Sequence, residues 1–538
     1  MHTARSRWAT FDRVQQVEHL IIGAGIAGLV LRRFLESDRV VILDPEPAGY
    51  KIGESLIPEL FRHPELAALL PRVQALPSYT PKYGTTFVAQ GEVALFPIGQ
   101  REIGEAMHVA RAELEGALID AWELEVVRAR VTSIDFERKR VQTSAGEYEV
   151  SGLILDCSGP AMVVAKALGE IENLLPVHAT WGYYDVVAEH PEALVEMIAA
   201  QGLRYLQYDV RHRQAVAASE VDMRQIARTT YLSQVADGIW TWQIPLFRGR
   251  MLSYGVVSRH GPVSAEAYRE IAERTHAPHF ELRRRPEGEA AFDRIHERNG
   301  FARQAKRPAD RDFILLADAF GFSDPVYSVG TGFAVSQAIE VAGLINAGAW
   351  SRETCEAYVA RCRETLARAR KAFEFWYSGA VLSDPIAASE IQHDFLLGGL
   401  FQTGITRHYG TAIELASLAS ERDPFEATWE GPELSGAVGE LLGLDEGKVL
   451  AGWSLLGARP CAGGIQLRWA GHGLPELTMM VADDAAGAQP CFRRSGPLAL
   501  SYMQLFDQPY PQVPALAGLF EGVSARMQGR EQAWLGLG

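Results

Sequence analysis

The first part of the chain carries the clearest pattern of hydrophobic and polar positions. His19–Ile22 is a short apolar run, residues 29–35 repeat apolar positions at helical spacing, and residues 40–43 form a second apolar run. A strand, a helix and a strand in this order predict a βαβ unit with two parallel strands.

Apolar and polar positions further along predict a β-rich middle followed by a helical segment. The strand candidates are residues 203–210, 229–235 and 251–257, with two more at residues 465–469 and 477–481. Residues 354–375 have amphipathic helical spacing, which places Cys355 and Cys362 on one face, where we expect core packing.

A glycine-rich turn separates the first predicted strand from the first predicted helix. Gly23, Gly25 and Gly28 fit G-x-G-x-x-G. In such turns the first glycine permits the tight bend, the second lets the backbone approach a pyrophosphate, and the third lets helix pack on strand. Asp44 ends the second strand, 21 residues after Gly23, where it can accept a hydrogen bond from a ribose hydroxyl. The sequence therefore predicts a dinucleotide site.

A second motif lies in the middle of the chain, at residues 240–245, which read Trp-Thr-Trp-Gln-Ile-Pro. Trp240 and Trp242 are two residues apart, so both indoles point to one face of a strand. Pro245 has no N–H for the ladder, and we expect it to end that strand. Packing of a core sheet would account for the two tryptophans equally well.

Composition excludes several functional classes. The 538 residues are 47% hydrophobic and 22% charged, as in globular proteins that fold in water. The net charge of −15 argues against nucleic acid and anionic membranes as partners, and no apolar run has spanning length. Five scattered cysteines without a C-x-x-C pair predict reduced thiols and no metal site. We therefore expect a cytoplasmic protein of two or three lobes.

Three further motifs follow the glycine turn in order. Arg111 begins an R-x-x-L-x-x-x-L helix, Asp156 begins a D-x-x-G turn after a strand, and Asp318 follows a late strand and precedes Gly321. Together they resemble the flavoprotein hydroxylases. The resemblance implies FAD as the cofactor, with Arg111 reaching the flavin and Asp318 near the ribityl chain.

Two loops and a lysine extend the resemblance to the flavin-dependent halogenases. Residues 53–58 read Gly-Glu-Ser-Leu-Ile-Pro, a loop that touches the flavin in that family and includes Ser55. Residues 322–330 are similar to its F-x-D-P-x-x-S-x-G loop. The resemblance implies that the backbone N–H groups of Val329 and Gly330 hold chloride or bromide beside the flavin, and that Ser328 orients the loop.

The lysine is Lys82, at the entry to a predicted strand. The resemblance implies that it is the catalytic group, either donating a hydrogen bond to hypohalous acid as an ammonium or trapping it as a haloamine. The plainer alternative is a solvated lysine at a strand end. In the family, tryptophans such as Trp240 and Trp242 keep the substrate away from the flavin.

One position departs from the halogenases that act on free tryptophan. Tyr327 stands before Ser328, where those enzymes carry a glutamate, and in this it resembles the phenol and pyrrole halogenases. A phenol or pyrrole ring is already activated for halogenation, so the reaction needs less help from a basic residue such as that glutamate.

These features give a main hypothesis and two alternatives. The main hypothesis is an FAD-dependent halogenase that oxidises halide with a flavin C4a-hydroperoxide and halogenates an electron-rich phenol or pyrrole. A separate flavin reductase, binding transiently, would supply reduced flavin, and the aromatic substrate would be a small molecule, carrier-bound or part of a peptide. The second is a halogenase-like monooxygenase that hydroxylates an aromatic, such as a tryptophan or tyrosine within a peptide. The third is a flavin-binding assembly or chaperone protein without catalysis.

The resemblance also implies the architecture. We expect an α/β fold with a Rossmann-like FAD-binding domain of the flavoprotein hydroxylase type and an interleaved β-sheet substrate domain. This core spans residues 1–345, with the substrate part at about 78–104 and 176–298. A helical extension at 346–420 and a small C-terminal α/β lobe at 421–538 follow.

Overall fold

A computed structural model describes most of the chain between residues 14 and 366, together with four strands near the C-terminus. The gaps in the first part are residues 62, 90–91, 97–105, 210–213, 218–225, 237, 327, 329, 361 and 364–365; the C-terminal strands occupy residues 449–450, 453–461, 464–471 and 474–482.

The described residues up to 366 form two layers, and a parallel sheet is the centre of the first one. Its five strands in the described residues are, in spatial order, β24 (Phe313–Leu315), β13 (Ile154–Asp156), β2 (His19–Ile22), β3 (Val40–Asp44) and β9 (Val126–Arg128). Its three middle strands are apolar and almost wholly buried, as expected of parallel strands covered on both faces. The βαβ prediction is confirmed by β2, α1 (Ile26–Phe34) and β3.

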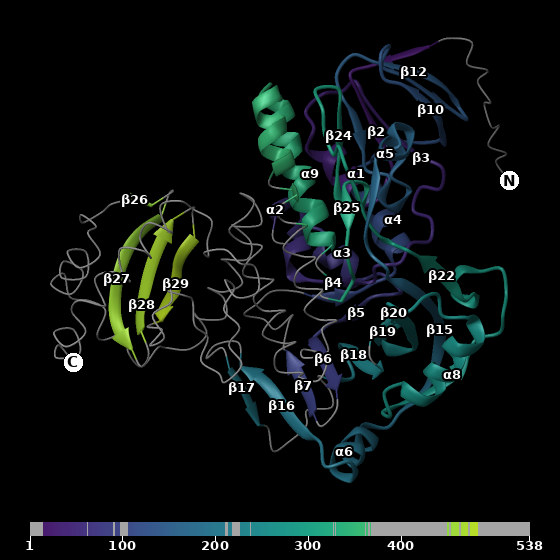
Figure 1. Ribbon diagram of the computed structural model, residues 1–538, viewed down its shortest axis with the longest axis vertical. Helices are drawn as coiled ribbons and strands as arrows, with labels where there is room; N and C mark the ends of the chain where they lie inside the picture. Colours follow the sequence, from purple (N-terminus) through teal and green to yellow (C-terminus); the bar gives the residue numbers. More distant parts are fainter. Residues whose placement is uncertain are drawn as a thin grey trace.

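Helices cover this sheet and build the largest core. The helix α1 packs against the long helix α9 (Gly330–Asn346), and the two lie side by side in Figure 1. Leu29 and Val30 of α1, with Val335 and Ala338 of α9, are buried in one cluster with the sheet. The remaining helices of this part are α2 (Pro64–Ala67), α3 (Leu70–Gln74), α4 (Arg111–Ala121) and α5 (Val163–Leu168).

A large mixed sheet forms the second layer (Figure 1). Its ten strands in the described part of the chain are β17 (Gln214–Ala217), β16 (Arg204–Asp209), β7 (Glu92–Phe96), β6 (Gly84–Ala89), β18 (Thr229–Ala236), β19 (Ile239–Leu246), β20 (Met251–Ser258), β15 (His178–Glu189) and β21 (Phe280–Arg284) in spatial order, and β22 (His296–Asn299), which also pairs with β15. The helix α8 (Ala265–Thr275) contacts β15, β18 and β20, and α6 (Pro191–Ala200) follows β15 in the chain.

The two faces of the large sheet have different roles. Tyr254 and Val256 of β20 cluster with Tyr268 of α8, so this face is closed by the helix. The residues between them point to the opposite face, because side chains alternate along a strand. That face carries Trp181 and Trp242, whose ring centroids are 6.4 Å apart.

A glycine makes room for these tryptophans. Gly255 of β20 pairs with Trp242 of β19 on one side and with Trp181 of β15 on the other. A Cβ atom at Gly255 would lie only 2.1 Å from the Trp242 ring. The missing side chain therefore lets the indole lean across β20.

Gly255→Ala is expected to destabilise the protein by about 1–3 kcal/mol, because the methyl group forces the Trp242 ring out of its position. The readout is the shift of the urea unfolding midpoint followed by near-UV circular dichroism. The matched control is Gly343→Ala, an exposed position in α9 where a Cβ atom would meet nothing within 4 Å. An unchanged midpoint in Gly255→Ala would show that the indole relaxes without cost.

The expectation that Pro245 ends its strand is wrong. The strand β19 continues to Leu246, and Pro245 pairs with Leu252 of β20. The strand on the other side of β19 is β18, and the pairing of these two strands ends at Tyr231 and Gln243. No residue of β18 therefore needs a hydrogen bond from the backbone of residue 245, and a proline is tolerated there.

Short strands form further small sheets in the described part of the chain. Among the described residues, β4 (Ser55–Leu56), β8 (Met107–His108) and β5 (Thr80–Pro81) form one small antiparallel sheet. Two others consist of β14 (Ile171–Leu175), β23 (Ala302–Ala305) and β25 (Gly321–Phe322), and of β1 (Gln15–Val17), β12 (Gly146–Val150), β11 (Arg140–Thr143) and β10 (Val131–Asp135). The chain passes repeatedly between the layers, as an interleaved arrangement requires.

The C-terminal strands form an antiparallel sheet of their own, in the order β26 (Val449–Leu450), β27 (Trp453–Cys461), β28 (Gly464–Gly471) and β29 (Leu474–Ala482). The strands predicted at 465–469 and 477–481 fall within β28 and β29. Residues 352–360 are helical, while most of the predicted helical extension lies outside the described residues. The domain boundaries stay predictions.

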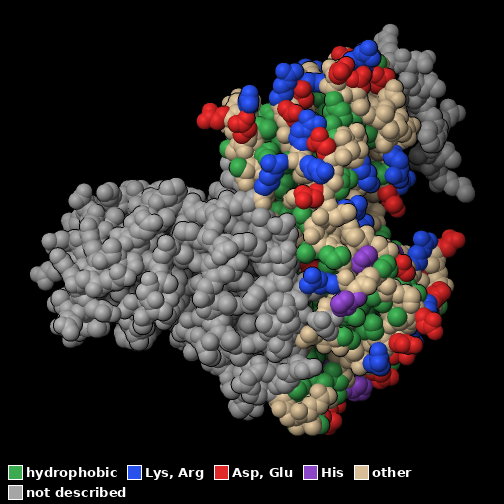
Figure 2. All heavy atoms as spheres, in the orientation of Figure 1, with side chains coloured by type: hydrophobic (Ala, Val, Ile, Leu, Met, Phe, Trp, Pro, Cys, Tyr) green, Lys and Arg blue, Asp and Glu red, His purple; other side chains and the backbone are tan. Residues whose placement is uncertain are grey.

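The described surface shows interspersed charges. On the face shown in Figure 2, Lys and Arg side chains alternate with Asp and Glu, so the negative net charge is not gathered in one patch there. No helix within the described residues is long and apolar enough to cross a membrane. The described cysteines Cys157, Cys355 and Cys362 are buried and form no disulfide with one another.

Candidate functional site

The three glycines of the turn after β2 have separate physical roles. Gly23 has φ of +103°, and a Cβ atom there would lie 2.4 Å from the Cys157 carbonyl oxygen. A Cβ atom at Gly28 would lie 2.0 Å from the Gly23 oxygen. At Gly25 the nearest atom would be 3.7 Å away, so nothing in the fold requires glycine at that position. Gly25 instead lines a cavity, and its lack of a side chain leaves space for a ligand there.

Two cavities meet at this turn. One has a volume of about 650 Å³ and extends towards the large sheet; the other, of about 630 Å³, extends past β3 towards β10. Residues at the glycine turn, at the end of β3 and in the loop after it, and in the segment after β13 line both cavities: Gly23, Asp44, Tyr50, Lys51, Ser158 and Ala161. The two cavities lie at the carboxyl ends of parallel strands, where α/β sheets bind ligands. Together they suit an elongated ligand with one half in each cavity.

Asp44 stands on the shared edge of the cavities. Its Oδ2 accepts a hydrogen bond from the Ala24 N–H at 2.8 Å, and its Oδ1 accepts one from the Glu46 N–H at 2.8 Å. These bonds fix the carboxylate against the glycine turn. Its contact with a ribose stays a prediction.

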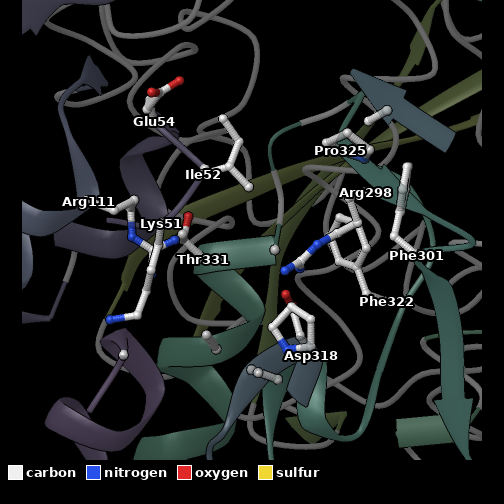
Figure 3. A pocket seen from close by; sticks show the side chains of 18 of the residues that line it. Lys51, Ile52, Glu54, Arg111, Arg298, Phe301, Asp318, Phe322, Pro325 and Thr331 are labelled. Atoms are coloured by element: carbon white, nitrogen blue, oxygen red, sulfur yellow. The ribbon is translucent and has the colours of Figure 1, made fainter. Parts of the chain in front are cut away.

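Charged groups line the larger cavity on two sides (Figure 3). Arg111, at the start of α4, donates to the buried Glu115 at 2.8 Å, which also accepts from Lys51 at 2.6 Å. On the opposite side Figure 3 places Arg298 beside Asp318. Asp318 lines the cavity and is half-buried. Burial raises the pKa of its carboxyl group, although the positive charges of Arg111 and Arg298 act in the opposite direction.

Lys82 is fully buried, with 1% of its surface exposed, which rules out the solvated alternative. Its Nζ donates to Ser55 Oγ at 2.9 Å. The sheet of β4, β8 and β5 makes this contact possible, because it sets Ser55 and Thr80 on either side of His108. Ser55 lines the cavity, whereas Lys82 lies one hydrogen bond behind the wall.

Ser55 also joins Lys82 to other hydroxyl groups. Its Oγ lies 2.9 Å from Thr230 Oγ1 and accepts from Ser328 Oγ at 3.1 Å. Thr230 in turn lies 2.9 Å from His108 Nε2. Burial, and then the positive charge of Lys82, hold the pKa of His108 well below its usual range, so the ring is neutral at neutral pH. Neither His108 nor Thr230 was anticipated from the sequence.

The loop before α9 closes the cavity near Ser55. Ser328 has φ of +58°, and α9 begins two residues later at Gly330, which lines the cavity. Thr331 Oγ1 is buried and has no hydrogen-bond partner within the described residues. Tyr327 and Val329 lie outside the described residues. A helix N-terminus with an unsatisfied hydroxyl beside it favours an anion.

Tryptophans form the cavity wall on the large sheet. Trp240 and Trp242 are buried on the same face, with ring centroids 6.1 Å apart, and both line the cavity together with Trp181. The sequence motif identified two of these three indoles. Trp181 comes from an apolar strand with no motif, and only the register of β15 with β20 reveals it.

Comparisons with solved structures identify the fold. A flavoprotein/dehydrogenase from Cytophaga hutchinsonii superposes with a TM-score of 0.53 at 20% identity, covering 76% of this chain and 100% of that one. The halogenase PltM, in complex with phloroglucinol and FAD, gives 0.57 at 17% identity, covering 77% and 86%. The flavin-dependent brominase Bmp2 gives 0.52 at 16% identity, covering 77% and 96%.

This is the fold of the FAD-dependent halogenases. The α/β fold class predicted from the sequence is confirmed, and so is the resemblance at the level of fold. No known family profile and no curated protein matches the sequence. The two joined cavities suit the two halves of a dinucleotide, because Gly25 leaves space in the larger one and the second extends beyond Asp44.

Proposed function

We propose that the protein is an FAD-dependent halogenase that acts on an electron-rich aromatic of the phenol or pyrrole type. The observation that carries this proposal is the buried Lys82, hydrogen-bonded to Ser55, which meets Ser328 at the cavity wall. Three segments distant in the sequence, each similar to a halogenase motif, converge on this one point. A chance combination of motifs would not place them in contact.

FAD would occupy both cavities. Gly23, Gly25 and Gly28 form the turn for the pyrophosphate, and Asp44 holds the ribose edge. The flavin would lie in the larger cavity against these four residues: Ser55, Arg111, Asp318 and Gly330. When bound and reduced, FAD with dioxygen supplies the two-electron oxidant that converts halide to hypohalous acid.

The halide, chloride or bromide, would bind at the N-terminus of α9. The backbone N–H groups of Val329 and Gly330 are its donors in this proposal, and the unsatisfied Thr331 hydroxyl is a further one. Ser328 orients this loop through its bond to Ser55.

Lys82 would act on hypohalous acid through its place behind Ser55. An ammonium that donates to Ser55 Oγ polarises the hydroxyl, which faces the cavity and can donate to the incoming oxidant. The Trp240 and Trp242 rings would separate the aromatic substrate from the flavin. The fold neighbour PltM has been solved with phloroglucinol, a phenol, which supports the phenol type together with Tyr327 in place of a glutamate.

One observation favours the alternative, a monooxygenase that hydroxylates an aromatic, which could be a tryptophan or tyrosine within a peptide. Lys82 does not itself line the cavity, and direct oxygen transfer needs no lysine on the wall. A flavoprotein/dehydrogenase shares the fold as well. Both functions would use a separate flavin reductase.

Incubation with FAD, a flavin reductase, NADH and bromide is expected to brominate phenols, resorcinols or pyrroles, whereas free tryptophan should react poorly. Mass spectrometry of the products is the readout, and omission of bromide is the control. Oxygenated product alone in saturating bromide would replace the halogenase by the monooxygenase. Efficient bromination of free tryptophan would contradict the phenol or pyrrole type.

A further inference from the structure

A row of hydrogen-bonded side chains joins two residues that line the larger cavity, Tyr50 and Glu54, through Tyr183, which does not line it. Tyr50, in the loop after β3, lines the cavity, and its hydroxyl lies 2.7 Å from that of Tyr183 on β15. The Tyr183 hydroxyl donates to Glu54 Oε1 at 2.6 Å. The indole Nε1 of Trp181 donates to the Tyr50 oxygen at 2.7 Å. Neither Lys82 nor the hydroxyl groups around it belong to this row.

The row has a fixed direction when Glu54 is ionised. An indole N–H can only donate and a carboxylate can only accept. Each O–H group therefore points the same way, from Tyr50 to Tyr183 and from Tyr183 to Glu54. If Glu54 holds a proton on Oε1, the row reverses, and the Tyr50 O–H is free to donate into the cavity. The state of a buried carboxyl thus decides what the cavity wall offers.

Glu54 can change its state near neutral pH. It is 1% exposed, and burial raises its pKa to about 7 although the Tyr183 hydrogen bond and the charge of Arg111 oppose the shift. Burial also raises the pKa of both tyrosines, which stay neutral. The groups that face the row are Arg111 of α4 and Ser253 of β20 at Glu54, and Arg298 and the stacked, neutral His296 at Tyr50.

We infer that Tyr50, Tyr183 and Glu54 form a proton relay, which carries a proton from the side of Tyr50 that faces the cavity to the buried carboxyl group of Glu54, a second residue of the cavity lining. The inference rests on the proposed function only for the source of the proton, which is the aromatic ring. In this inference Tyr50 receives the ring proton, and Tyr183 passes a proton on to Glu54. Glu54 belongs to the loop at residues 53–58 that resembles a halogenase motif, but neither that motif nor the spacing of the three residues in the sequence points to the relay.

The proton balance closes with hypohalous acid as the oxidant. The ring carbon takes the halogen, the oxygen–halogen bond breaks, and its electron pair leaves with hydroxide. The ring C–H bond then breaks, its electrons return to the ring, and its proton goes to the Tyr50 oxygen. The Tyr50 proton moves to Tyr183, and the Tyr183 proton moves to Glu54. Return of one proton along the row converts hydroxide to water and restores the carboxylate.

Infrared difference spectroscopy of the protein without added FAD tests the carboxyl group directly. Titration from about pH 5 to about pH 9 is expected to show the C=O band of a protonated buried carboxylic acid, lost with a midpoint near 7. Glu54→Gln should remove the band. Tyr183→Phe should move the midpoint upwards, because it removes a donor that stabilises the carboxylate.

The matched control is Tyr254→Phe, on the opposite face of the same sheet, where the hydroxyl bonds Thr275. This change should leave the band where it is. A wild-type band that Glu54→Gln does not remove, or a midpoint that Tyr183→Phe does not move, would overturn the relay. The outcome of this titration is independent of whether the protein halogenates, hydroxylates or does neither.

The kinetic arm measures kcat against pH in the FAD-loaded protein. Glu54→Gln and Tyr183→Phe should each lower kcat by about 10²-fold or more and flatten its dependence near pH 7, with Tyr254→Phe close to the parent. A parental kcat and pH profile in both variants would overturn the relay and leave the proposed halogenase intact. Hydroxylated product with the same losses would overturn the halogenase and leave the relay intact.

Discussion

Lys82→Met is expected to lower the rate of product formation by about 10²–10³-fold or more while leaving FAD binding unchanged. Methionine fills the volume of the lysine stem in its buried site but cannot donate to Ser55. Reduced flavin should still be consumed, since Lys82 lies behind the cavity wall and not against the flavin site. Product by mass spectrometry, peroxide release and bound FAD are measured on the same preparation.

The control for this experiment is Lys306→Met, which removes an exposed lysine far along the chain. It should retain the parental rate. A near-parental rate in Lys82→Met would make the lysine a structural group only, and the halogenase proposal would lose the observation that carries it. Loss of FAD together with loss of product would instead place Lys82 in the support of the cofactor site.

Gly25→Val should weaken FAD binding by at least about 100-fold, or on the order of 3 kcal/mol. The branched side chain would fill the space of the pyrophosphate, because Gly25 borders the cavity with nothing closer than 3.7 Å to a Cβ atom. The same open space lets the variant fold. Titration with FAD, followed by flavin fluorescence, is the measurement.

Gly25 is the position of this turn where binding and folding can be separated. Side chains at Gly23 or Gly28 would overlap backbone oxygen atoms at 2.4 and 2.0 Å, so those variants would confuse misfolding with loss of the site. Gly343→Ala, on the exposed face of α9, serves as the control and should bind FAD as the parent does. Stoichiometric FAD in a folded Gly25→Val protein would show that the turn does not hold the pyrophosphate.

Local patterns predicted the parts of the fold that depend on neighbouring residues. The run His19–Ile22, the glycine turn and the helix after it follow from burial on both faces of a parallel strand and from the geometry of the turn. The strands predicted at 229–235 and 251–257 appear as β18 and β20. In these cases the information lies within about ten residues.

The surroundings of Lys82 and Glu54 could not be predicted in the same way. Strands of two residues such as β4, β5 and β8 have no periodicity to detect, yet they bring Ser55 to Lys82. Tyr183 meets Glu54 only because the large sheet packs against the loop after β3. Pro245 was misplaced for a related reason: whether a proline is tolerated depends on which neighbour strand has already ended.

The glycine turn has a consequence for the order of events during synthesis. The wall behind Gly23 is the backbone of Cys157 and Ser158, and the strand beyond it, β24, begins at Phe313. These parallel pairings join segments more than 100 residues apart, which makes them slow to form. The glycine turn leaves the ribosome long before β13 and β24 have been synthesised, so the dinucleotide pocket is still incomplete in the nascent chain. A dinucleotide would then stabilise only the nearly finished chain, and its supply would affect the yield of folded protein after release and not the early steps of folding.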